Sequence, residues 1–198
     1  DLLINRLAAE TELLMADGFI EPHFFAGFSG GRKAVLPGVA GYRTVLANHC
    51  AKFIAHPKAR TGVLDGNPIH RDMLYAAKTA NLAFILNVVI DDRKRIIAAF
   101  AGDSVAAHEN GCAFVRKRAS VKKIEGAKIV VVTNGGYPLD QNIYQSVKGM
   151  TAAEATCAKG GVIIMVSACS DGHGGESFFK AMSEAASPSE ILKKALGV

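Results

Sequence analysis

The chain has 198 residues, of which 49% are hydrophobic, and a formal net charge of +5. This length allows one large or two small domains with a hydrophobic core, and the composition excludes a disordered or fibrous chain. The small positive charge favours anionic ligands over nucleic acid. The basic run between Arg116 and Lys123 has no interleaved aromatic residues and is interpreted as a solvated connector.

The four cysteines lie far apart and form no Cys-x-x-Cys pair, which argues against a zinc site and a disulfide framework. No apolar run reaches the about 18 residues that a membrane-spanning helix needs, and no signal peptide is visible. We therefore expect a cytoplasmic protein without a membrane partner.

The first predicted element is an amphipathic helix over residues 2–16, which ends at Asp17-Gly18. Leucines at positions 2, 3, 7 and 14 begin its helical pattern. No capping residue precedes it, and Asp1 is not an initiator methionine. These features predict that the chain is a fragment of a longer protein.

The most informative stretch covers residues 21–53 and reads EPHFFAGFSGGRKAVLPGVAGYRTVLANHCAKF. Three glycines, Gly27, Gly30 and Gly31, permit close backbone approach, so their amides can converge on an anion such as a phosphate. Lys33 follows two residues after Gly31. The run GFSGGRK lacks the spacing of a nucleoside-triphosphate loop.

A helix is predicted from about Gly41 to Phe53, and its apolar stripe includes His49, which is therefore predicted to point inward. The stripe consists of Tyr42, Val45, Leu46, His49 and Phe53. A lone histidine on an apolar face is more often a core residue than a ligand. Convergence of His23, Lys33 and His49 on one glycine-lined anion site favours a functional role instead.

Further elements follow in the first half of the chain. Asn67-Pro68 is a typical helix start, and residues 82–90 with 95–101 predict a β-hairpin. Asn87 lies in this otherwise apolar strand and needs hydrogen-bond partners. A helix then starts at Asp103 or Ser104, and a domain boundary falls at residues 119–126.

The second half predicts a parallel βαβ unit, with strands over residues 128–133 and 162–168. Capping boxes are expected at Thr151 and Ser187. The predicted fold class is α/β with two lobes: an α/β lobe with a β-hairpin over residues 1–120, and a Rossmann-like βαβ lobe over residues 125–198. Because two strands are marginal for an independent sheet, both lobes are expected to be incomplete.

Gln145 and Lys148 lie three residues apart on one helical face, after the first strand of this second lobe. Ligands gather at such strand ends, where Lys148 can pair with a substrate carboxylate and Gln145 can hydrogen-bond it. The alternative is an exposed polar pair. The loop CSDGHGG has no nucleophile elbow and is interpreted as glycine turns stabilised by Asp171. Three further histidines have no motif context and are interpreted as surface or core residues: His56, His70 and His108.

The sequence resembles the lactate racemase family, the nickel-pincer nucleotide enzymes. The resemblance rests on the run HFFAGFSGGRKAVLPG with a histidine sixteen residues after its lysine, and it extends through NPIHRDM, FILNVVID, AFAGD and CSDGHGG. It implies that Lys33, beside the Gly30-Gly31 turn, is joined through a thioamide to a nicotinate-derived nucleotide that holds nickel. It further implies the remaining roles: His49 as nickel ligand, His23 as one of two acid–base histidines, and Gln145 and Lys148 as substrate-binding residues.

The resemblance implies a racemase or epimerase that removes a hydride from a 2-hydroxy acid and returns it to the other face. The second base and the phosphate-binding residues are expected outside this chain, so the chain alone is expected to be inactive. Cofactor-biosynthesis enzymes are expected partners. Residues 1–120 then correspond to the C-terminal part of a cofactor-binding catalytic domain, and residues 125–198 to the N-terminal part of a second α/β domain.

Three other interpretations remain open. A pyridoxal-phosphate enzyme also places a lysine beside a glycine-rich phosphate turn, but it leaves His49 without a role. A nicotinamide-dependent dehydrogenase is weaker, because no GxGxxG follows a predicted strand. A non-catalytic binding or assembly domain fits a chain from which essential catalytic groups are missing.

Overall fold

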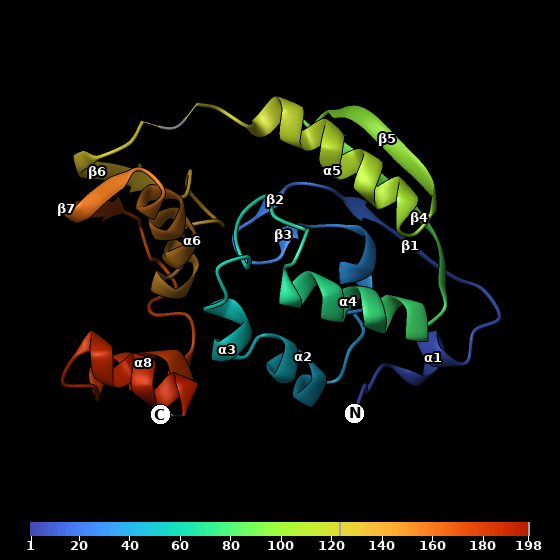
Figure 1. Ribbon diagram of the computed structural model, residues 1–198, viewed down its shortest axis with the longest axis horizontal. Helices are drawn as coiled ribbons and strands as arrows, with labels where there is room; N and C mark the ends of the chain where they lie inside the picture. The colour runs from blue at the N-terminus through green and yellow to red at the C-terminus, as the bar shows by residue number, and fades with distance from the viewer. Residues whose placement is uncertain (123, 198) are drawn as a thin grey trace. The chain divides into compact units, whose positions relative to one another are not determined.

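The computed structural model describes residues 1–122 and 124–197, which form two compact units divided between Ser120 and Val121 (Figure 1). Both units combine helices with strands, so the predicted α/β class is confirmed. Lys123 in the basic run and Val198 at the end of the predicted second lobe lie outside the described residues.

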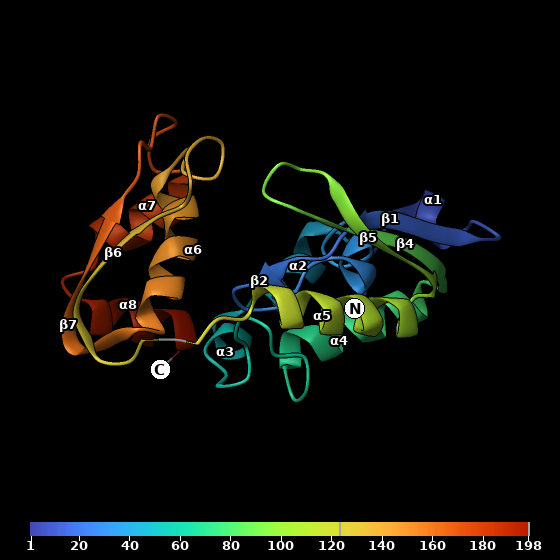
Figure 2. The same cartoon turned by 90° about the horizontal axis from the view of Figure 1, so that it is seen from above.

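Unit 1 is built on a three-stranded sheet in the order β1-β4-β5. Strand β1 (Leu14–Phe19) runs parallel to β4 (Leu82–Ile90), and β4 pairs antiparallel with β5 (Ile96–Asp103). The predicted hairpin is therefore confirmed. Helix α5 (Ala106–Ala119) packs on β4 and β5, and Figure 2 shows it running beside the sheet. Helix α4 (Pro68–Thr79) also contacts β4.

The helix predicted over residues 2–16 is wrong. Helix α1 covers only Arg6–Ala9, and residues 14–19 form strand β1. Exposure in β1 alternates at every residue, which is the period of a strand. The leucine spacing satisfied a helical pattern locally, but pairing with β4 across a long separation in sequence decides the structure.

The helix predicted from Gly41 to Phe53 is interrupted. Helix α2 (Tyr42–Asn48) ends with His49 at its C-cap, and α3 (Ala51–Ile54) starts after the extended residue Cys50. The predicted apolar stripe is wrong in part: Tyr42 is 77% exposed and Leu46 is 51% exposed, whereas Val45 and Phe53 pack against the core. The buried side chains of α2 are Thr44 and Asn48. Asn48 Nδ2 donates to Asp72 Oδ2 of α4 at 2.8 Å, so a polar contact orients this helix.

Two local predictions in unit 1 have different outcomes. Asn67 caps α4 as predicted, and its side chain accepts hydrogen bonds from the N–H groups of Ile69 and His70. Residues 116–118, interpreted as part of a connector, instead form the last turn of α5. Cations are favourable there because the carbonyl ends of a helix carry partial negative charge.

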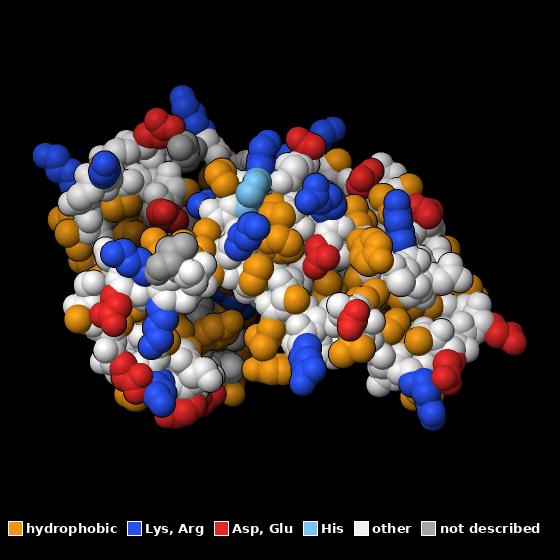
Figure 3. All heavy atoms as spheres, turned by 60° about the horizontal axis from the view of Figure 1, so that its bottom comes forward, with side chains coloured by type: hydrophobic (Ala, Val, Ile, Leu, Met, Phe, Trp, Pro, Cys, Tyr) orange, Lys and Arg blue, Asp and Glu red, His pale blue; other side chains and the backbone are white. Residues whose placement is uncertain are grey.

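The core of unit 1 lies on one face of the sheet. One cluster surrounds Ile69 and Met73 of α4, and a second joins Ile20 and Phe28 to Val115 of α5. The small antiparallel pair β2 (Pro22–His23) and β3 (Gly27–Phe28) leads into η1 (Gly31–Ala34), a single 3-10 turn. Apolar side chains also reach the surface among scattered charges (Figure 3).

Unit 2 confirms the predicted βαβ unit. Strands β6 (Ala127–Thr133) and β7 (Cys157–Val166) are parallel and are joined through helix α6 (Ile143–Glu154). Helices α7 (Glu176–Ser183) and α8 (Pro188–Leu196) follow. Ser187 caps α8 as predicted, but Thr151 lies inside α6, where its hydroxyl donates to Val147 O.

Among the described residues, no helix combines the length and the apolar character needed to cross a membrane.

Candidate functional site

The glycine turn of unit 1 is anchored to the sheet by Asn87. The Gly31 N–H donates to Asn87 Oδ1 of β4 at 2.7 Å, which gives the buried asparagine the partner that its position requires. Gly31 has φ of 53°, and a Cβ there would come within 2.8 Å of the His108 ring. A Cβ on Gly30, with φ of 76°, would come within 2.7 Å of Asn87 Oδ1. Both glycines are therefore required by close approach.

This anchoring corrects one expectation. The Gly31 amide donates to Asn87, so it is not directed at an anion as the glycine pattern suggested. What the glycines allow is close packing of the turn, which in turn fixes the backbone of Lys33. The Lys33 N–H donates to Gly30 O at 3.2 Å, and its carbonyl accepts from Gly38 N–H at 3.1 Å. The Lys33 side chain is half-buried.

His49 is close enough to Lys33 for the lysine charge to act on it. Burial is the larger cause that lowers the pKa of His49, and the Lys33 charge lowers it further. Nδ1 of His49 lies 3.2 Å from Val45 O. Because a carbonyl only accepts, Nδ1 carries the proton and Nε2 keeps its lone pair.

A neutral imidazole of this kind suits a metal ligand. Metal-binding histidines commonly donate one ring N–H to a carbonyl, which directs the other nitrogen to the metal. Among the described residues, no group of three or more His, Cys, Asp or Glu side chains is arranged around a metal position. A metal at His49 would need further ligands from beyond these residues, and a bound group that carries its own donor atoms fits this requirement.

His23 belongs to the same neighbourhood through Phe25. The His23 ring meets Phe25 edge-on at 4.6 Å between centroids, and Phe25 meets His49 edge-on at 5.0 Å. Nδ1 of His23 accepts a hydrogen bond from Ala26 N–H at 3.2 Å. The neutral ring therefore carries its proton on Nε2, the opposite tautomer to His49. The rings of His23 and His49 thus both pack against Phe25, and the Lys33 charge acts on His49.

Arg32 is a site residue that the sequence interpretation missed. It is 1% exposed, and Nη2 donates to Ala26 O at 2.8 Å. Nη1 donates to Gly30 O at 3.3 Å and lies 2.9 Å from Nε2 of His108. Burial lowers the pKa of Arg32 to about 10, so the group remains a cation near neutral pH. A basic residue beside Lys33 gives no sign of burial in sequence, because such residues are rarely buried.

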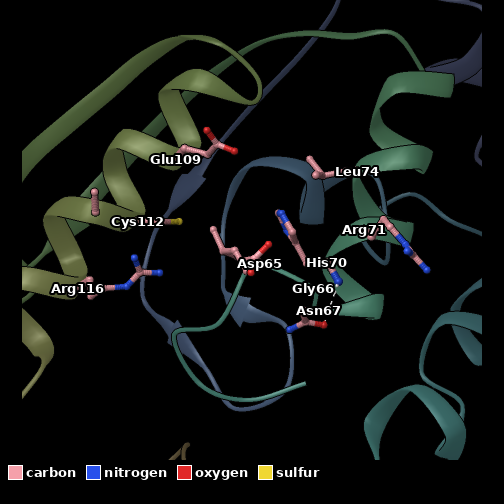
Figure 4. Close-up of a pocket in the computed structure, with 11 residues that line it drawn as sticks. Asp65, Gly66, Asn67, His70, Arg71, Leu74, Glu109, Cys112 and Arg116 are labelled. Carbon is pink, nitrogen blue, oxygen red and sulfur yellow. Dashed lines mark hydrogen bonds between the residues drawn. The ribbon is translucent and has the colours of Figure 1, made fainter. Parts of the chain in front are cut away.

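A pocket of about 520 Å³ opens between α4 and α5 (Figure 4). Its wall includes His70 and Leu74 of α4, and Cys112 and Arg116 of α5. The candidate residues His23, Lys33 and His49 do not line it. Burial, with the Arg32 charge as second cause, lowers the pKa of His70 to about 4. His70 and His108 are buried and His56 is exposed, which confirms their interpretation as core or surface residues.

In unit 2, Gln145 and Lys148 occupy the first turns of α6. Gln145 is half-buried and Lys148 is exposed. The Asn142 side chain caps the helix by accepting from Gln145 N–H at 2.9 Å, so the position of Gln145 is set by the helix start. The loops that follow β6 and β7 are linked by the buried Asp140, whose side chain accepts a hydrogen bond from Ala168 N–H at 3.1 Å. Asp171, expected to stabilise the loop, is exposed and contributes its backbone N–H to Gln141 O.

Comparison with known proteins gives consistent matches along the chain. The lactate racemase N-terminal domain matches residues 1–62, and the lactate racemase C-terminal domain matches residues 121–198. The lactate racemase of Thermoanaerobacterium thermosaccharolyticum is 63% identical over 195 residues, which cover 98% of this chain and 46% of that protein. The lactate racemase of Lactiplantibacillus plantarum is 60% identical over 196 residues, covering 99% of this chain and 46% of that protein.

Solved structures agree. The lactate racemase apoprotein from T. thermosaccharolyticum superposes with a TM-score of 0.96 at 61% identity, over 100% of this chain and 47% of that chain. A Thermotoga maritima protein superposes with a TM-score of 0.62 at 27% identity, over 81% of this chain and 41% of that chain. The chain spans about half the length of the curated relatives it matches. On these matches, the chain belongs to the lactate racemase family.

Proposed function

We propose that the intact protein is a racemase or epimerase of 2-hydroxy acids that carries a nickel-pincer nucleotide on Lys33. The observation that carries this proposal is the pairing of a half-buried lysine with a neutral histidine whose Nε2 lone pair is left for a metal. It occurs in a chain 60% and 63% identical to two lactate racemases. A pyridoxal-phosphate enzyme would leave that lone pair without a role.

Lys33 and His49 would hold the cofactor. When bound, it supplies a nickel-activated nicotinate ring that accepts a hydride and gives it back. Lys33 would form the thioamide from a turn whose backbone is fixed by Gly30 and Gly31. His49 would give Nε2 to nickel, with Val45 O holding the ring through Nδ1.

His23 would handle the proton of the substrate hydroxyl. Its neutral ring presents Nε2–H, which donates a hydrogen bond to the oxygen of a 2-oxo acid. Uptake of a proton at Nε2 requires the ring to give up its present tautomer and the Ala26 N–H bond. The turn from Phe25 to Gly27 would therefore have to adjust during proton transfer.

Lys148 and Gln145 would bind the substrate carboxylate, the lysine by charge and the glutamine by a hydrogen bond. A second base and the groups that hold the nucleotide phosphate would come from outside these 198 residues. Residues 1–120 would then be the C-terminal part of the cofactor-binding domain, and residues 125–198 the N-terminal part of a second domain. We place the protein in the cytoplasm, with the cofactor-making enzymes as partners.

Two substitutions test the proposal in intact protein co-produced with cofactor-making enzymes. Lys33→Arg keeps the charge but cannot form the thioamide, so mass spectrometry should find no covalent nucleotide and metal analysis no retained nickel. His49→Ala should keep the nucleotide mass and lose most of the nickel. Racemisation of enantiopure lactate, followed by chiral chromatography, should be lost in both.

Lys52→Arg, at an exposed lysine of α3, is the matched control and should keep the nucleotide, the nickel and the activity. A covalent nucleotide on the Lys33→Arg protein would show that another residue carries it. Nickel retained unchanged by His49→Ala would remove the histidine from the metal site.

A further inference from the structure

We infer that Arg32 is the positioning residue of this site, which holds Lys33 and His23 in place from the buried side of the turn. The roles of those two residues rest on the proposed function, whereas the contacts of Arg32 do not. Arg32 is adjacent to Lys33 in η1, and successive side chains of a 3-10 turn point about 120° apart. Arg32 is buried while Lys33 is only half-buried, so fixing one side chain in the core directs the other toward the site.

A second path leads from Arg32 to His23 through one residue. Nη2 of Arg32 donates to the carbonyl of Ala26 at 2.8 Å, and the N–H of Ala26 donates to Nδ1 of His23 at 3.2 Å. The same guanidinium therefore fixes the residue that selects the tautomer of His23. Its bond to Gly30 O at 3.3 Å holds the carbonyl that also accepts from Lys33 N–H.

The partners of Arg32 explain why arginine is needed. Among the described residues, no carboxylate forms an ion pair with it, and its Nε lacks a hydrogen-bond partner. A buried cation without a counter-ion is unfavourable, so the carbonyl oxygens of Ala26 and Gly30 take over its stabilisation. Only a planar fork of donors reaches several carbonyls at once; a lysine ammonium at this position is a point charge on a flexible stem.

The test compares Arg32→Lys with Val89→Ala in the intact protein. Val89 is a buried β4 residue of the core cluster under α5, so its truncation lowers stability without removing a bond to the turn. Nitrogen NMR of the His23 ring in the cofactor-free protein reports the tautomer. Mass spectrometry of protein co-produced with the cofactor-making enzymes reports the nucleotide on Lys33.

We expect Arg32→Lys to mix the two tautomers of His23 and to lower the covalent nucleotide fraction by about tenfold or more. Val89→Ala should leave both readouts unchanged at a similarly lowered unfolding midpoint. His108→Gln, which removes one neighbour of the guanidinium and keeps every residue of the turn, should shift the His23 signals in the same direction. It provides the comparison if Arg32→Lys does not fold.

The inference would be overturned if Arg32→Lys kept the His23 signals and the nucleotide fraction of the unmodified protein. If Arg32→Lys fails to fold, unchanged His23 signals in His108→Gln would overturn it instead. Equal losses in Val89→Ala would overturn it as well, because general destabilisation would then be the cause. If the unmodified protein itself carries no nucleotide, the proposed function fails instead. The His23 signals of the cofactor-free variants then decide the role of Arg32 by themselves.

Discussion

His23 and His49 show how backbone partners assign different chemistry to the same side chain. An N–H group faces Nδ1 of His23, whereas a carbonyl faces Nδ1 of His49. The first leaves a proton on Nε2, and the second leaves a lone pair there. The sequence placed both histidines near Lys33, but it could not distinguish them, because the deciding partners are main-chain atoms positioned by a turn and by the end of α2.

His108 predicts a loss of stability in acid. Burial, followed by the Arg32 charge, lowers its pKa from 6.5 to about 3, so the folded protein keeps it neutral where the unfolded chain binds a proton. Its stabilising contribution is complete above pH 6.5 and is lost as the pH falls toward about 3. Across this window the free energy of unfolding falls by about 1.4 kcal/mol per pH unit for the one proton that the unfolded chain binds and the folded protein does not.

The free energy of unfolding, measured with urea at several pH values, should therefore fall less steeply below pH 6.5 in His108→Gln than in the unmodified protein. His56→Gln, at an exposed histidine, is the control and should follow the unmodified curve. Identical slopes for His108→Gln and the unmodified protein would mean that His108 titrates normally in the fold.

At the scale of elements, Asn67 joins α4 to the site loop. Its Oδ1 accepts from the first helical N–H groups, and its Nδ2 donates to Phe25 O at 2.9 Å. Asn67→Ala should lower the free energy of unfolding by about 2–3 kcal/mol, because the cap is lost and a buried carbonyl is left unpaired. Urea denaturation measures the change.

Asn67→Ser separates the two contributions, since its hydroxyl is a helix-capping acceptor and it lacks the amide donor to Phe25. It should be less destabilising than Asn67→Ala. If the two variants lose the same stability, the cap contributes little and most of the loss comes from the broken hydrogen bond to Phe25.

Local signals explain which elements could be predicted. Asn67-Pro68 marks α4, and the β-branched run of β4 with its turn marks the hairpin, so both are confirmed. Residues 2–16 and 41–53 failed because distant contacts decide them: β1 pairs with β4, and Asn48 binds Asp72. The site followed the same division. A contiguous pattern indicated Lys33 as a candidate, whereas the role proposed for Arg32 depends on atoms brought together only by folding.

At the scale of the whole molecule, the connection between the two units is the part of the described backbone that a protease should reach first. Val121 is 87% exposed and Ile124 is 75% exposed. Thermolysin cleaves before such apolar residues, so limited digestion should first cut here and yield pieces that correspond to the two units.

Mass spectrometry of the early products identifies the cut, and replacing both residues with aspartate should delay it. Early cleavage inside β4 or β6 instead would show that a strand opens more readily than the connection between the units.

The anchors of the turn also set an order in time. Gly31 binds Asn87, which is 56 residues later in the chain, and Arg32 contacts His108, which is 76 residues later. During synthesis the ribosome therefore releases Lys33 well before either anchor exists. A nascent chain that ends before β4 contains Lys33 but lacks the contacts that fix the turn around it. An enzyme that recognises the folded turn can therefore act only after translation has passed α5.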